Sequence, residues 1–276
     1  MAKHIELEGL ALGFHRFVWL ALGLGLIMAV RGQRLSLIGF RLSWLPGLLF
    51  AANIAMFFTA IKLTTVANAT VIGAIQPAMS MVLVGRIFGE RVHRSDIWLT
   101  GCSIAGVVLV VYGSSSKPEW DFRGDLLSIG SILAWTWYLF VTKRARQEIG
   151  AIELQTTLTI VAAVVMLPIA LLSGQSMSVP GSSIWFLALL AIVGGIGHTL
   201  VNFAHGHTKL LLVSLMFLGI PVLATSWAAI FLGESVNRRQ VTGMAIVLAG
   251  LGVLIITNER RDRAGKRELA LDSPRR

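Results

Sequence analysis

The sequence predicts an all-α integral membrane protein with nine membrane-spanning helices. Of its 276 residues, 55% are hydrophobic and 14% are charged, and the mean hydropathy is +0.75. These figures exclude a disordered chain and argue against an ordinary soluble domain, in which roughly a quarter of the residues are charged. Because a helix needs about 20 apolar residues to cross a bilayer, the apolar and glycine residues provide for about nine spans.

The spans are placed by apolar runs that end at charged residues, Gly or Pro. They are expected at 12–30, 43–61, 66–88, 97–114, 125–142, 154–173, 183–203, 210–232 and 240–257. Backbone groups must be paired inside a bilayer, and these runs are much longer than barrel strands, so each should be an α-helix. The first run resembles a secretory signal, but Arg31 and Arg34 follow it without a small-residue cleavage site, which favours a retained span.

The basic residues predict how the spans are oriented. The chain has 24 Lys and Arg against 14 Asp and Glu, a net charge of +10. When nine spans are threaded, most basic clusters fall on one side and the uncharged stretch 173–183 falls on the other. By the positive-inside rule we expect a multi-pass protein of the plasma or inner membrane, with a cytoplasmic C-terminus and an external N-terminus. The charge surplus therefore indicates topology in the lipid bilayer, and no nucleic acid is expected as a partner.

An internal repeat organises the chain. Five residues around one helix end recur 144 residues later. The first copy has Pro77, Gly89, Glu90, Val92 and Arg94, and the second has Pro221, Gly233, Glu234, Val236 and Arg238. Five helices separate equivalent points, so the two copies should cross the membrane in opposite directions, as in inverted-repeat secondary transporters.

The repeat also predicts the domains. We expect a first repeat of four helices at 1–114, a linker at 115–124 and a second repeat of five helices at 125–258. A basic cytoplasmic tail should follow at 259–276.

The repeated pattern resembles the EamA branch of the drug/metabolite transporter superfamily. The motif Pro-x11-Gly-Glu stands at 77–90 and again at 221–234, each time before a glycine-bearing apolar helix. Arg16, Trp135 and Tyr138 match the pattern as well. The resemblance covers nearly the whole chain and implies a permease with ten helices in two inverted repeats around a substrate cavity.

The beginning of the chain departs from that family pattern. Residues Met1–Arg16 resemble the loop that normally follows the first helix, so helix one is expected to be absent. The first repeat would then have four helices and the second five.

Charged groups within hydrocarbon are usually functional, yet all 14 acidic residues fall at span ends or in loops. A buried carboxylate relay is therefore not expected, and an anion-binding cavity is favoured over a cation-binding one. Glu90 and Glu234 stand at helix ends, where they either fix the following loop or take part in gating. Pro77 and Pro221 each lack a backbone amide hydrogen for the helix. They produce either fixed kinks or helix bends that take part in gating the transport pathway.

The polar and aromatic residues within the spans are the candidates for substrate contact. His198 and Asn202 lie one turn apart on a helix face. Trp135 lies some ten residues inside its span, roughly 15 Å along the helix, which is too deep for an interfacial belt. These side chains either make interhelical hydrogen bonds and core contacts or line a wet cavity. The candidate cavity residues are Asn53, Phe57, Gln76, Trp135, Tyr138, His198 and Asn202.

These patterns favour a secondary transporter of small polar metabolites, of the amino-acid or metabolite exporter class, working by alternating access. Its partners should be a small-molecule substrate and the bilayer, with a homodimer left open, and we expect no cofactor, no metal and no catalytic residue. One alternative is a non-transporting membrane subunit or scaffold, suggested by the absent helix. The other is an intramembrane hydrolase with Ser103 and His198 as nucleophile and base.

Overall fold

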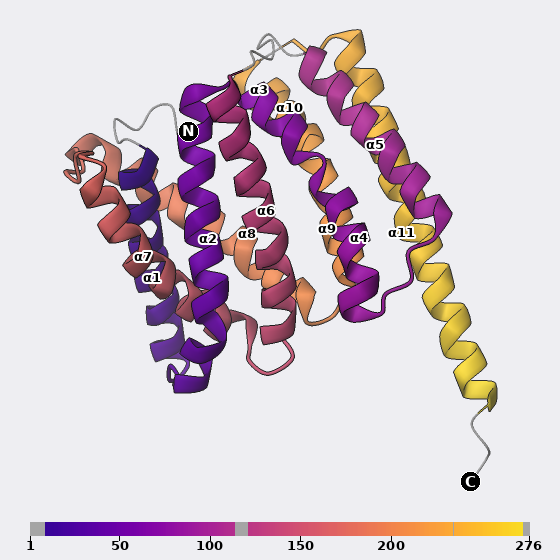
Figure 1. Cartoon of the computed structure of the whole chain (residues 1–276), viewed down its shortest axis with the longest axis horizontal. Helices are drawn as coiled ribbons and strands as arrows, with labels where there is room; N and C mark the ends of the chain where they lie inside the picture. The colour runs from indigo at the N-terminus through magenta and orange to yellow at the C-terminus, as the bar shows by residue number, and fades with distance from the viewer. Residues whose placement is uncertain (1–8, 114–120, 234, 273–276) are drawn as a thin grey trace. The chain divides into compact units, whose positions relative to one another are not determined.

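The structure is a computed structural model that describes residues 9–113, 121–233 and 235–272 (Figure 1). In these residues all regular structure is helical, and nine helical segments are long and apolar enough to cross a membrane. They coincide with the nine expected spans, with several ends longer by a few residues. The prediction of an all-α membrane protein with nine spans is confirmed.

Two of the nine spans are interrupted. The span from Ala67 to Phe88 consists of α3 and α4, and the span from Leu210 to Phe231 consists of α9, a short 3-10 helix and α10. The helices are α1 (Gly9–Val30), α2 (Leu37–Leu63), α3 (Val66–Gly73), α4 (Gln76–Phe88), α5 (Arg94–Gly113), α6 (Phe122–Ala145), α7 (Ala151–Leu172), α8 (Ile184–His205), α9 (Leu210–Met216), α10 (Ile220–Leu232) and α11 (Arg238–Asp272), with 3-10 helices η2 (Gly181–Ser183) and η3 (Phe217–Gly219).

Helix α1 begins earlier than the sequence predicts. The apolar run predicts a start at 12, and the family resemblance implies a loop up to Arg16, but α1 starts at Gly9. Its first free amides are bonded by a distant side chain, because Gln175 Oε1 accepts hydrogen bonds from the amides of Leu10 (2.9 Å) and Ala11 (3.1 Å). Arg16 therefore lies two turns inside the helix, about 10 Å from its start.

The chain forms two compact units. The first contains Met1–Gly73 and Pro118–Val213, and the second contains Ala74–Lys117 and Ser214–Arg276. Helices α1, α2, α3, α6, α7 and α8 belong to the first unit, whereas α4, α5, α10 and α11 belong to the second. Each unit therefore combines elements from both halves of the sequence.

In the second unit the repeat is visible helix by helix. Helices α10 and α11 begin 144 residues after α4 and α5, and α10 ends 144 residues after α4. The motif glycines end the shorter helices, because Gly89 (φ 64°) and Gly233 (φ 67°) have left-handed backbone conformations that favour glycine. The predicted Glu234 lies outside the described residues. Glu90 is half-buried directly after its helix end.

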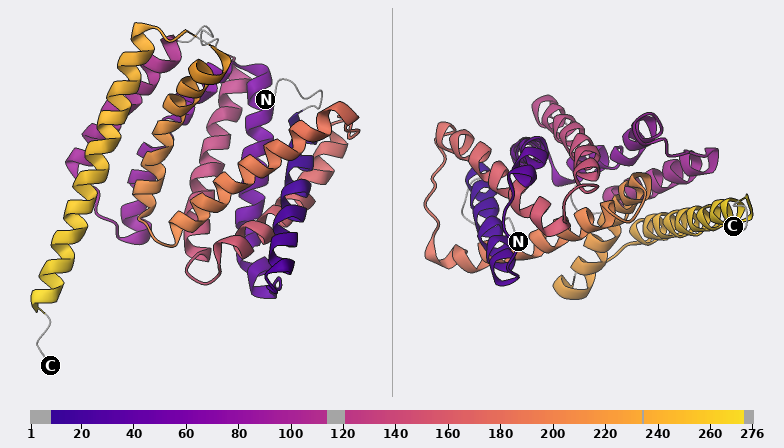
Figure 2. Two further views of the ribbon diagram at one scale, coloured as in Figure 1. Left: turned by 180° about the vertical axis from the view of Figure 1, so that it is seen from behind. Right: turned by 90° about the horizontal axis from the view of Figure 1, so that it is seen from below.

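Helices α5 and α11 pack side by side in opposite directions (Figures 1 and 2). A Cβ atom on Gly106 would lie 2.8 Å from the Gly243 carbonyl oxygen, and a Cβ on Gly243 would lie 2.5 Å from that of Gly106. Gly250 likewise faces Ser103 and the carbonyl of Leu99. In the repeat, Leu99 corresponds to Gly243 and Gly106 corresponds to Gly250. The contact between Gly106 and Gly243 is therefore equivalent to the contact between Gly250 and Leu99, as expected for two helices related by a two-fold axis. A two-fold relation between equivalent helices is typical of inverted repeats.

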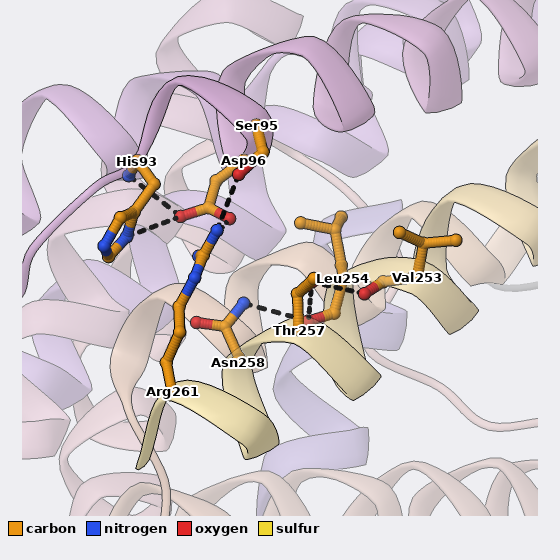
Figure 3. A network of polar contacts seen from close by, with 8 residues as sticks. All are labelled: His93, Ser95, Asp96, Val253, Leu254, Thr257, Asn258 and Arg261. Carbon is orange, nitrogen blue, oxygen red and sulfur yellow. Dashed lines mark hydrogen bonds and ion pairs between the residues drawn. The ribbon is translucent and has the colours of Figure 1, made fainter. Parts of the chain in front are cut away.

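A buried carboxylate holds the beginning of α5 against α11 (Figure 3). Asp96 is fully buried, and its Oδ1 pairs with Arg261 at 2.9 Å. Its Oδ2 accepts a hydrogen bond of 2.9 Å from the backbone amide of His93. Arg261 also donates to the Ser95 hydroxyl at 2.7 Å. One carboxylate thus caps the start of α5 and binds a cation of the neighbouring helix.

Helix α11 continues beyond its expected end at 257 and runs to Asp272, so much of the predicted tail at 259–276 is helical. The residues after Asn258 are mostly good helix formers. Glu259 and Arg263, one turn apart, form an ion pair of 2.5 Å.

Candidate functional site

Five rings from four helices meet inside the first unit. Phe17 comes from α1, Phe50 from α2, Trp135 and Tyr138 from α6, and His198 from α8. Trp135 stacks on Tyr138 with ring centroids 4.8 Å apart, and Phe50 stacks on Tyr138 at 5.2 Å. The His198 ring meets Phe50 edge-on at 4.7 Å and Trp135 at 5.7 Å. We call these five residues the ring cluster.

Small residues on α8 allow His198 to reach the ring cluster. A Cβ atom on Gly195 would collide with the Leu20 side chain of α1, and one on Gly194 would lie 2.5 Å from Nη2 of Arg16. The absence of these side chains lets α1 lie close to α8. His198 follows one turn later on the same side of α8.

The ring cluster has a buried base and an accessible edge. Phe17, Phe50 and Tyr138 are at most 1% exposed, whereas Trp135 and His198 are only half-buried. The two half-buried rings thus keep some exposed surface, and the buried rings of Phe50 and Tyr138 pack against them. Two of the predicted residues, Trp135 and His198, thus lie together at this edge, and Tyr138 lies behind them.

Asn202 is part of a buried polar network that joins α6, α7 and α8. Its side chain is fully buried, and its amide donates to Gln155 Oε1 at 2.6 Å. The Tyr138 hydroxyl donates to Asn202 Oδ1 at 3.4 Å, and the Gln155 amide donates to Thr159 at 3.0 Å. Asn202 lies one turn from His198 on α8, and it bonds Tyr138 of the ring cluster. Its side chain thus makes interhelical hydrogen bonds, which is one of the two roles that the sequence left open.

We expect Asn202→Leu to lower the free energy of unfolding by about 1–2 kcal/mol, because the Gln155 carbonyl and the Tyr138 hydroxyl would lose their partner. Thr199→Val is the matched control on α8, since the bond that the Thr199 hydroxyl makes within the described residues goes to the Gly195 carbonyl of its own helix. Thermal unfolding of the purified protein in detergent measures both. Equal effects of the two substitutions would contradict the structural assignment of Asn202.

Asn53 connects α2 to α6, one turn from Phe50. Its amide donates to the backbone carbonyl of Ser131 at 2.9 Å and to its hydroxyl at 2.8 Å, and that hydroxyl donates back to the Asn53 carbonyl at 3.2 Å. This reciprocal pair holds the two helices that carry Phe50 and Trp135 in register. Phe57, one turn further on α2, is 37% exposed and its ring lies against Phe58, outside the ring cluster.

The predicted residues Gln76, Pro77 and Pro221 belong to the second unit. Gln76 is buried and donates to the Ser80 hydroxyl at 2.8 Å, and its Oε1 has no hydrogen-bond partner within the described residues. Pro77 is the second residue of α4, directly after the interruption at 74–75, and Pro221 is the second residue of α10 after η3. Both prolines thus stand where a span is interrupted and a new helix starts, a position that needs no amide.

Arg16 is a residue of the site that the sequence pattern did not indicate. Its guanidinium lies over Gly194, one turn from His198, and Phe17 of the ring cluster is its chain neighbour. Because α1 begins at Gly9, Arg16 lies inside a span, and a search of the spans for basic as well as acidic residues would identify Arg16.

Two cavities lie at the α6–α7 end of the first unit. One of about 510 Å³ is lined by residues including Arg34, Arg146 and Glu153, and one of about 330 Å³ by Lys143, Arg146 and His205 among others. Arg146 donates to the Asn202 backbone carbonyl at 2.8 Å and to that of Ile149. Partial burial lowers the pKa of Arg146, and its cation stabilises the carbonyl-rich end of α8.

Ser103, considered as a nucleophile, lies in the second unit against Gly250. Its hydroxyl oxygen is buried and has no hydrogen-bond partner in the described part of the chain. A Ser–His pair requires the two side chains within hydrogen-bond reach, and the structure therefore offers no support for a hydrolase.

Comparison with known proteins gives the family. The model of the EamA-like transporter family matches residues 1–112 and 122–257. The chain belongs to the EamA-like transporter family. The resemblance noted from the sequence is thereby confirmed, and the family points to a transporter rather than to an enzyme.

Two known proteins are similar to this EamA-like chain. A probable amino-acid metabolite efflux pump of Salmonella typhimurium (strain LT2) is 25% identical over 209 residues, which cover 71% of this chain and 70% of the pump. A solved crystal structure with 17% identity superimposes with a TM-score of 0.79 and covers 92% of this chain and 90% of the other. That structure shares the fold.

Proposed function

We propose that the protein is a secondary transporter that exports small polar metabolites across the plasma or inner membrane. The observation that carries this proposal is the ring cluster, in which the half-buried rings of Trp135 and His198 lie together at its accessible edge. An apolar surface with a few fixed polar groups is the usual lining of a small-molecule site. The family and the efflux pump named above support the same function.

Alternating access is the mechanism that the fold supports best. The chain divides into two compact units, and one boundary between them, at Gly73–Ala74, coincides with the interruption before Pro77. Interrupted helices at equivalent places in two repeats are a feature of secondary transporters. We propose that these interruptions bend when access changes from one side to the other, with the C-terminus on the cytoplasmic side.

The test is flux in reconstituted vesicles, screened against amino acids, nucleosides and sugars. Trp135→Leu should weaken the apparent affinity for the transported substrate by about three- to tenfold, because one ring contact contributes about 0.5–1.5 kcal/mol beyond its buried area. Trp137→Leu is the matched control, since Trp137 lies on the same helix, is 46% exposed and contacts Phe140 outside the ring cluster. His198→Ala should act like Trp135→Leu.

Equal losses in the Trp135 and Trp137 variants would contradict the assignment of the site. A screen without substrate-dependent flux would instead favour a non-transporting membrane subunit.

A further inference from the structure

Arg16 is a charged residue inside a membrane span, and its surroundings are well defined. It is half-buried on α1, and its guanidinium lies against the backbone of Gly194. A Cβ atom at Gly194 would lie 2.5 Å from Nη2 and 3.2 Å from Nε, so a side chain there would displace the guanidinium from its position. Gly194 lies one turn from His198, which is at the accessible edge of the ring cluster.

Arg16 has no counter-charge among the residues that the structure describes. Its Nε is buried without a hydrogen-bond partner, and the described residues make no hydrogen bond or ion pair with its guanidinium. Arg261 and Arg146 differ, because the first binds a carboxylate and the second binds carbonyl oxygens. A guanidinium has five donors, and leaving a charge uncompensated in a membrane span is costly. This arrangement is therefore typical of a site completed by a ligand.

The nearby spans supply no carboxylate that could take this role. In the described part of the first unit, acidic residues lie at span ends or in the connections between spans. Asp121 binds the amide of Gly124, Asp125 binds Thr64 and Asn68, and Glu153 binds Ser36. The described part of the chain therefore leaves this position open to an anion that is not one of its own side chains.

We propose that Arg16 binds the carboxylate of the substrate, while the apolar part of the same molecule lies on Trp135 and His198. This inference rests on the proposed transport site and names its substrate class as carboxylic acids with an apolar or ring-bearing side group. A guanidinium binds a carboxylate through two parallel hydrogen bonds. A single guanidinium beside aromatic rings suits a monoanion, whereas a phosphate dianion would call for further cations.

The decisive experiment compares an acid with its neutral amide. The full-length protein is purified in detergent, and 3-phenylpropionate and 3-phenylpropionamide are titrated while ligand-induced stabilisation against heat is followed. The acid should bind at least about tenfold more tightly than the amide, the value expected for a hydrogen-bonded charge pair. In Arg16→Gln this preference should disappear while binding of the amide is retained, and in Arg16→Lys part of the preference should persist.

Arg41→Gln is the control for the change of charge, because Arg41 is exposed on α2 of the same unit. It should keep the full preference for the acid. Equal binding of acid and amide to the unaltered protein, no binding of the acid, or an unchanged preference in a folded Arg16→Gln variant would each overturn the proposal. If Arg16→Gln does not fold, the acid and the amide are compared in Arg16→Lys instead. A reduced preference for the acid in that variant would support the proposal, and an unchanged preference would overturn it.

Flux separates this inference from the proposed function. Arg16-dependent binding of the acid without flux of any substrate would support the carboxylate site and contradict transport. Flux of sugars or nucleosides that is unchanged in Arg16→Gln, with no preference for acids, would support transport and overturn the carboxylate site.

Discussion

Replacing Asp96 with Ala is expected to lower the free energy of unfolding by about 3 kcal/mol or more, the cost of breaking a buried ion pair. The fully buried carboxylate binds Arg261, whose side chain is 29% exposed, and also caps the amide of His93. Without Asp96, the guanidinium of Arg261 loses its anion and α5 loses the cap at its first turn. Thermal or denaturant unfolding of the purified protein in detergent measures the loss.

Glu259→Ala is the control for Asp96→Ala. Glu259 forms an ion pair with Arg263, but the two side chains are 58% and 73% exposed. Exposed pairs of this kind contribute about 0.5 kcal/mol or less. A double variant that lacks both Asp96 and Arg261 should be less unstable than the sum of the single variants. Losses of similar size in the Asp96 and Glu259 variants would contradict the importance of the buried pair.

Gly243→Ala should separate α5 from α11 and reduce stability by about 1–3 kcal/mol, the usual cost of overpacking. The new methyl group would lie 2.5 Å from the carbonyl oxygen of Gly106 and 2.9 Å from the amide nitrogen of Val110. Both are backbone atoms, which cannot turn aside as a flexible side chain can. Gly243→Val should cost more than Gly243→Ala.

Gly252→Ala is the matched control for this prediction. Gly252 lies on the same helix, and a Cβ atom there has no neighbour within 4 Å. Since alanine favours helix by about 0.5–1 kcal/mol over glycine, this variant should be as stable as the unaltered protein or slightly more so. A similar decrease in melting temperature for both variants would show that the contact with Gly106 is unimportant.

Much of the fold could be predicted because it depends on local and repeated properties of the sequence. The length of each apolar run determines whether a helix can cross the bilayer, and the nine runs therefore predicted nine spans. The two motif glycines, Gly89 and Gly233, predicted helix ends correctly because a left-handed residue favours glycine wherever it occurs.

The candidate site was less predictable because its geometry depends on residues far apart in the sequence. The early start of α1 depends on Gln175, more than 160 residues away, and so the depth of Arg16 was missed. Phe50 is one of 13 phenylalanines, and nothing in its local pattern indicated contact with Tyr138 and His198. Asn202 was identified as polar within a span, but its partner Gln155 could not be inferred from spacing.

The length of α11 has a practical consequence for attached reporters. Its 35 residues correspond to about 52 Å of helix, whereas the hydrocarbon core of a bilayer is about 30 Å thick. The spanning part ends at Arg261, and the further turns to Asp272 extend about 16 Å beyond it. A fluorescent protein or spin label attached after Asp272 would therefore be held at the end of a continuous helix. A small tilt of α11 would then move the label by several ångströms.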